Sequence, residues 1–170
     1  VIESNKYPFE EIEKTTKSNR KIGLGVMGFA DMLIQLGIPY NSDQAVKLGE
    51  RLMAFIEEEA LSASSELARV RGSFPNFSRS VWVENFKQLR NATVTSVAPT
   101  GSISIIANCS SGIEPIFAIA YYRWILGGKK LVEVNILFEK VAKDRGIYSK
   151  SLMEKIARKG SLSGIKEIPS

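Results

Sequence analysis

Apolar residues recur every three or four positions in several stretches of the chain, which is the spacing of an amphipathic helix. One such stretch is 22–37, where the apolar positions are Ile22, Val26, Ala30, Leu33 and Ile34. We therefore predict a helix over 22–37 that contains the glycines of "IGLGVMGFADML" within it.

A second, longer helix is predicted from Ser42, a suitable N-cap, to Gly72, a typical C-terminal stop. Its apolar stripe is formed by Leu48, Leu52, Phe55, Ala63, Leu67 and Val70. The three acids at 57–59 are consecutive and point in different directions around a helix, so we interpret them as a solvated face and not as a metal site.

The region 90–124 has a different pattern. "NATVTSVA" is rich in β-branched residues and predicts a strand, "PTGS" breaks it, and "SISIIANC" can form a short helix. "SSG" is a second break, and "IEPIFAIAYYRW" predicts another strand. Further helices are predicted over "LVEVNILFEKVAKDRG" and "SLMEKIARKG". We find no repeat or linker, so residues 1–170 are predicted to be a single α/β domain.

Composition limits the protein class. At 170 residues with 44% hydrophobic and 24% charged residues, the chain can bury one core. No apolar run approaches the roughly 20 residues of a membrane span, and the N-terminus lacks a signal pattern. We therefore expect a cytoplasmic protein that does not contact a membrane. The net charge of +5 comes from Lys and Arg interspersed with acids, which favours a solvated surface over a nucleic-acid footprint.

Two residue types are scarce. The sequence has no histidine, and Cys109 is its only cysteine. Histidine-dependent triads, Cys/His zinc sites, disulfides and dithiol pairs are therefore excluded within this chain. We predict that Cys109 is structural, because no His or cluster of Lys and Arg adjoins it in sequence to lower its pKa.

Gly23, Gly25 and Gly28 have the G-x-G-x-x-G spacing of dinucleotide-binding proteins. That fingerprint needs a buried strand directly before its first glycine, because the phosphates lie between a strand end and a helix N-terminus. The preceding "EEIEKTTKSNRK" is not a strand. We therefore favour a packing role, in which the glycines let another backbone approach closely.

The glycine in "VAPTGSISII" lies between a predicted strand and a predicted helix. Such a position presents unpaired backbone N–H groups, the positive end of a helix dipole and, here, several hydroxyls, which together suit an anion. An ordinary capped turn would have the same pattern, so spacing alone leaves both interpretations open. No P-loop lysine follows.

Three motifs carry a family resemblance: "TKSNRKIGLGVMGFADML", "SELARVRGSFPNF" and "NATVTSVAPTGSISIIANCSSGIEPIFAIAYYRW". Together they resemble the catalytic subunit of ribonucleotide reductase, in particular the adenosylcobalamin-dependent class, over about residues 1–145. The resemblance implies part of a ten-stranded α/β barrel that reduces ribonucleotides by thiyl-radical chemistry. It also implies that one loop holds the substrate phosphates: Pro99, Thr100, Gly101, Ser102, Ile103 and Ser104.

The sequence also departs from the family. It lacks the Asn-x-Cys-x-Glu finger-loop motif and the reducing cysteine pair, begins without Met and ends at "KEIPS". We therefore expect a piece of the later catalytic barrel that has no catalytic or metal-binding residue and binds no cofactor alone. The parent enzyme would use adenosylcobalamin, take a ribonucleoside diphosphate, act with the remainder of its chain and form a homodimer. A helical scaffold module and an unrelated phosphate-binding enzyme are the alternatives.

Overall fold

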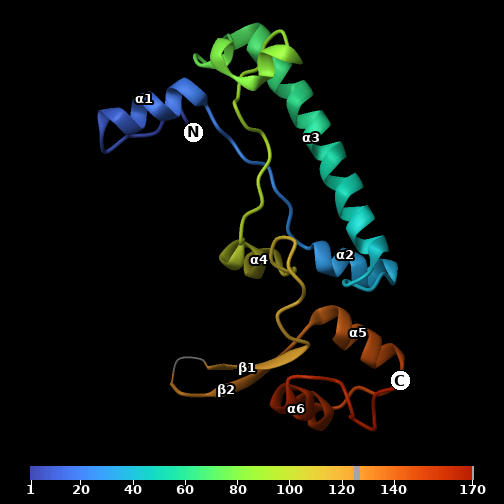
Figure 1. Ribbon diagram of the computed structural model, residues 1–170. Helices are drawn as coiled ribbons and strands as arrows, with labels where there is room; N and C mark the ends of the chain where they lie inside the picture. Colours follow the sequence, from blue (N-terminus) through green and yellow to red (C-terminus); the bar gives the residue numbers. More distant parts are fainter. Residues whose placement is uncertain (125–126, 170) are drawn as a thin grey trace. The chain divides into compact units, whose positions relative to one another are not determined.

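The computed structural model describes residues 1–124 and 127–169 (Figure 1). Its elements in chain order are α1 (Glu10–Asn19), α2 (Phe29–Leu36), α3 (Asp43–Arg71), η1 (Phe77–Arg79), η2 (Val81–Glu84), α4 (Gly101–Ala107), β1 (Ala120–Trp124), β2 (Lys130–Val134), α5 (Ile136–Asp144) and α6 (Lys150–Lys159). The described residues are therefore mainly helical, with one small sheet.

Two compact units are present. The first consists of Val1–Val26 and Asn41–Thr100, and the second consists of Met27–Tyr40 and the described residues from Gly101 onward. The prediction that 1–170 form a single domain stays a prediction, and we describe each unit by itself.

Helix α3 confirms the longer predicted helix of the first unit. The Ser42 hydroxyl accepts a hydrogen bond from the Ala45 N–H at 3.2 Å, and the helix ends at Gly72, where φ is +77°. Its apolar stripe is not its buried face, however, because Phe55 and Val70 are 62% and 78% exposed. The buried positions of α3 are Ala45, Ser64 and Ala68, and these small side chains let neighbouring segments of the first unit approach the helix closely.

A buried polar network connects α3 to two other segments of the first unit. The Ser64 hydroxyl accepts from the N–H groups of Arg90 and Asn91, each at 3.1 Å, and donates to Asn91 Oδ1 at 3.1 Å. Asn91 Nδ2 in turn donates to the Arg20 carbonyl at 2.9 Å. Ser64 and Asn91 are 1% and 7% exposed, so these polar groups depend on one another for hydrogen bonds.

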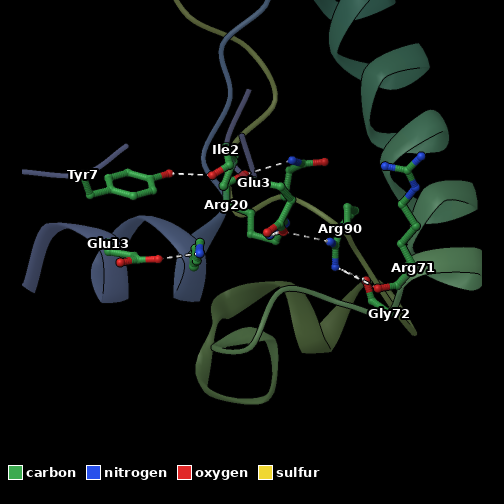
Figure 2. A network of polar contacts seen from close by, with 10 residues as sticks. Ile2, Glu3, Tyr7, Glu13, Arg20, Arg71, Gly72 and Arg90 are labelled. Atoms are coloured by element: carbon green, nitrogen blue, oxygen red, sulfur yellow. Dashed lines mark hydrogen bonds and ion pairs between the residues drawn. The ribbon is translucent and has the colours of Figure 1, made fainter. Parts of the chain in front are cut away.

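A second network of polar contacts includes the C-terminus of α3 (Figure 2). The Arg90 guanidinium donates to the carbonyls of Arg71 at 2.8 Å and Gly72 at 3.0 Å. The Glu3 carboxylate pairs with Arg20 and lies 3.8 Å from Arg90. The hydrogen bond from Arg20 lowers the pKa of the Glu3 carboxyl, and burial lowers the pKa of the Arg90 guanidinium.

The segments around Leu24 and Thr95 run parallel in the first unit, and these two residues form an isolated bridge. The Leu24 N–H donates to the Val94 carbonyl at 2.8 Å, and the Ser96 N–H donates to the Leu24 carbonyl at 3.1 Å. Within "NATVTSVA", Thr95 therefore has a parallel partner, but its bridge is isolated and the predicted strand is not formed along the rest of this stretch.

The predicted helix over 22–37 begins too early, since α2 starts only at Phe29. Residues 21–28 are not helical, and Gly23 and Gly25 lie against Ser96. A Cβ on Gly25 would be 2.5 Å from the Ser96 carbonyl oxygen, and one on Gly23 would clash with the Ser96 side chain. The glycines do permit close backbone approach, as expected, but in an extended segment and not within a helix.

The second unit contains an antiparallel hairpin of β1 and β2, in which Tyr122 is paired with Val132. Its core consists of Ala120, Ala142, Leu152, Met153, Ile156 and Ile165. The predicted helix over 131–146 is wrong in its first part, because Leu131–Val134 belong to β2. There the β-branched Val132 and Val134 pair across the hairpin.

Both later helices of this unit begin at side-chain caps. Asn135 Oδ1 accepts from the N–H groups of Leu137 and Phe138, each at 3.0 Å, and thus starts α5 after the strand. The hydroxyl of Ser149 accepts from the Leu152 N–H at 3.1 Å and starts α6, which confirms the short predicted helix. Among the described residues, no helix combines the length and apolar character needed to cross a membrane.

We expect Ser64→Ala to destabilise the protein by about 1–3 kcal/mol, because it leaves buried partners around Asn91 without hydrogen bonds. Ser62→Ala is the matched control, since Ser62 is an exposed serine on the same helix. Both changes gain the same helix propensity. Chemical unfolding of the two variants would measure the difference, and equal stabilities would show that the network does not stabilise the fold.

Candidate functional site

The six residues predicted to hold phosphates lie at the start of α4 (Figure 1). The boundary between the two compact units falls between Thr100 and Gly101. Thr100 has a φ of +52°, which is uncommon for a residue other than glycine. Pro99, Gly101, Ser102 and Ile103 are exposed, whereas Ser104 is only 2% exposed. The loop therefore presents its first residues to solvent and buries its last.

Ser104 is hydrogen-bonded within the second unit. Its hydroxyl donates to the Gly101 carbonyl at 3.2 Å and lies 2.9 Å from the Ser111 hydroxyl. Because a serine hydroxyl has one hydrogen, Ser111 must be the donor of the second bond. The Ser104 side chain thus supports the first turn of α4, and the hydroxyl of Ser102 is more accessible to a ligand.

Gly101 differs from the glycines at 23 and 25. Within the described residues, a Cβ on Gly101 would meet no atom within 4 Å, and its φ is outside the left-handed region. The protein's own packing therefore does not require glycine here. Backbone N–H groups at a helix start can bind a phosphate, and Gly101 has no side chain to obstruct its approach.

The segment 108–112 joins α4 to the N-terminus of α2 within the second unit. Asp31 Oδ2 accepts from the Ser110 N–H at 2.6 Å, and the Ser110 hydroxyl accepts from the Asp31 N–H at 3.3 Å. The Gly28 N–H also donates to the Ser110 carbonyl at 2.7 Å. Asp31 was not among the site residues predicted from the sequence, although an acid in the first turn of a helix is a recognisable signal.

A cavity of about 1430 Å³ lies in the second unit, beside α2, α4, the segment 108–118, the hairpin and the start of α5. Asp31, Cys109 and Glu114 line it, as does the Arg123–Glu133 ion pair at 3.3 Å. Cys109 is a free, half-buried cysteine, and its predicted structural role stays a prediction. Among the described residues, no group of three or more His, Cys, Asp or Glu side chains could hold a metal.

The sequence matches the family described as "Ribonucleotide reductase, barrel domain" over residues 1–89 and 84–170, and the chain belongs to this family. The match includes the residues after 145, where the resemblance in sequence is less distinct. The resemblance to a ribonucleotide reductase barrel is therefore confirmed.

Individual relatives agree. The chain is 54% identical over 166 residues to the vitamin B12-dependent ribonucleoside-diphosphate reductase of Thermoplasma acidophilum. The aligned residues cover 98% of this chain and 22% of that protein. It is 49% identical over 170 residues to the reductase of the same name from Mycobacterium tuberculosis, with 100% of this chain and 24% of that protein covered. The chain thus spans 22–24% of the length of these relatives.

A solved structure shows the same fold. The alpha subunit of the Actinobacillus ureae class Id ribonucleotide reductase superposes with a TM-score of 0.76 at 25% identity. The superposition covers 99% of this chain and 30% of that subunit. The described residues therefore contain the helices and the small sheet of one part of this fold.

We expect Gly25→Ala to destabilise the protein by about 1–3 kcal/mol, because the added methyl group would meet a backbone carbonyl that has to shift. Gly101→Ala is the matched control and should be neutral or stabilising by up to about 1 kcal/mol, since its Cβ meets open space in a helix. Thermal unfolding of both variants checks this contrast, which would be contradicted by equal losses of stability.

Proposed function

We propose that this chain is part of a ribonucleoside-diphosphate reductase, an oxidoreductase that makes deoxyribonucleotides by thiyl-radical chemistry. The observation that carries the proposal is identity of 49–54% over nearly the whole chain with two relatives of that name. These matches favour the reductase over a helical scaffold module. The substrate is then a ribonucleoside diphosphate, and the remainder of the reductase chain is the partner.

Within that enzyme, Pro99–Ser104 bind the phosphates of the substrate. The backbone N–H groups in the first turn of a helix have no intrahelical partner and carry partial positive charge, which suits a phosphate. Exposed Gly101 and Ser102 support this assignment, with the hydroxyls of Thr100 and Ser102 assisting. Ser104 supports the turn from its buried side.

The helices and extended segments belong to a ten-stranded α/β barrel. Parallel strands need a long crossover between them, and α3 lies in the connection between Leu24 and Thr95. Parallel pairing of these two segments supports the barrel. The glycines at 23 and 25 would allow neighbouring barrel strands to approach closely.

The radical chemistry resides elsewhere in the enzyme, and this chain alone does not reduce ribonucleotides. Reduction replaces the 2′-hydroxyl by hydrogen, releases water and oxidises a dithiol to a disulfide, in addition to requiring a thiyl radical. One cysteine cannot fill both roles, so we assign no catalytic residue here. We further propose a cytoplasmic homodimer, since free ribonucleotides are cytoplasmic and two-fold dimers are the commonest oligomers.

Adenosylcobalamin supplies the radical in the parent enzyme. The printed names of the Thermoplasma acidophilum and Mycobacterium tuberculosis relatives, which describe those proteins as vitamin B12-dependent, support this cofactor. We assign no cobalamin contact to residues of this chain.

In the complete enzyme, we expect Gly101→Val to raise the substrate KM about tenfold or more, which corresponds to about 1.4 kcal/mol. A branched side chain would occupy the space nearest the phosphate. Ser102→Ala should have a smaller effect, because several backbone donors remain. Substrate affinity is the measurement, with thermal stability as the control for folding.

Gly101→Ala should fall between the parent and Gly101→Val, since it adds only one methyl group. A normally folded Gly101→Val enzyme that binds the nucleotide as tightly as the parent would show that the loop is only a turn.

The cofactor is tested separately in the complete protein. We expect cobalt–carbon bond cleavage of added adenosylcobalamin during turnover, measured by the change in its visible absorption. Activity that instead requires a second subunit with iron or manganese would contradict the cobalamin proposal and leave the phosphate site unaffected.

A further inference from the structure

Helix α4 has little packing of its own in the second unit. Ser104 is its only buried residue within the described chain, while Ile103, Ile105 and Ile106 are 54%, 66% and 83% exposed. Apolar burial within the described residues therefore does not fix the position of this seven-residue helix. Polar contacts from the segment that follows it have to do so.

Several hydrogen bonds connect α4 to that segment. The Ser111 hydroxyl donates a hydrogen bond to the Ser104 hydroxyl at 2.9 Å. The Ser104 hydroxyl in turn donates a hydrogen bond to the Gly101 carbonyl, within α4, at 3.2 Å. The Cys109 N–H also donates to the Ser104 carbonyl at 3.0 Å. The relay from Ser111 therefore ends on the first residue of α4, at the turn proposed to hold phosphate.

The same segment is fixed on its other side by the N-terminus of α2. The Ser110 N–H donates to Asp31 Oδ2, and the Ser110 hydroxyl accepts from the Asp31 N–H. The Ser110 carbonyl accepts from the Gly28 N–H. A carboxylate that accepts from a backbone N–H makes a charge-assisted hydrogen bond, which is stronger than a neutral one. Asp31 is thus the charged group in the connection between α2 and α4.

Gly28 also contributes to this close contact. It has a φ of +81°, and a Cβ there would lie 3.5 Å from Cys109 Cβ. A residue with a side chain at this position would have a strained backbone, beside the segment that carries Ser110.

We propose that Asp31 and Ser111 are positioning residues for substrate binding: they hold the first turn of α4 in the orientation that receives the substrate phosphates. This inference rests on the proposed function of Pro99–Ser104 and adds the residues that act through that loop. Neither residue needs to touch the reacting atoms, so the effect of replacing them falls on affinity for phosphorylated ligands.

The test uses the complete reductase with the variants Asp31→Ala, Asp31→Asn and Ser111→Ala. Asp43→Ala is the matched control, because Asp43 is an exposed acid in the first turn of α3. For each protein we would measure kcat, KM and the Kd of a ribonucleoside diphosphate. The Kd of the corresponding nucleoside without phosphates and the thermal midpoint complete the set.

We expect Asp31→Ala to raise the Kd of the diphosphate about tenfold while kcat changes by less than about twofold, a loss of about 1.4 kcal/mol in binding. Asp31→Asn should recover much of the affinity, because its amide oxygen can still accept from Ser110. Ser111→Ala should raise Kd less than Asp31→Ala. The nucleoside without phosphates should bind equally to all variants, and Asp43→Ala should match the parent.

Three results would overturn the inference: unchanged diphosphate affinity in Asp31→Ala, equal loss of affinity for the nucleoside without phosphates, or a fall in kcat with Kd unchanged. If Asp31→Ala does not fold, Asp31→Asn and Ser111→Ala decide the question by the same criteria. Weak binding by Gly101→Val with normal binding by the Asp31 and Ser111 variants rejects only this inference. Normal binding by Gly101→Val rejects the phosphate site itself.

Discussion

The close approach of two extended backbones in the first unit is the constraint on which much of this structure depends. The Leu24–Thr95 bridge requires glycine at positions 23 and 25, because Ser96 occupies the space where side chains would be. The paired segment leads directly to Pro99, so its placement fixes where the proposed phosphate loop begins. The buried residues of α3, such as Ser64, are also small.

Both units contain hydrogen bonds between small polar side chains in addition to their apolar core residues. Ser64 and Asn91 form such a bond in the first unit, and Ser104 and Ser111 form one in the second. Large apolar residues remain exposed meanwhile, with Phe117 at 93% and Val70 at 78%. The described residues do not cover these side chains, and the chain spans 22–24% of its relatives' length.

Local signals predicted α3 and α6 well, because caps such as Ser42 and Ser149 act within a few residues of the helix start. Apolar spacing failed where a tertiary partner decided the outcome. Residues 22–26 have helical spacing but pair with a segment about 70 residues away, and Leu131–Val134 pair within a hairpin. A period in the sequence does not reveal whether a distant strand is available to form hydrogen bonds.

The sequence by itself determined the family resemblance and the limits set by one cysteine and no histidine, and it led to the proposal that "APTGSIS" binds phosphate. Only the tertiary structure decided that Ser104 is the buried hydroxyl of that segment and that Asp31 is hydrogen-bonded to Ser110. Asp31 and Ser110 are 79 positions apart, and Ser104 bonds to a serine beyond the end of its own helix. Hydrogen bonds between such positions have no local sequence pattern, because their geometry exists only after the chain has folded.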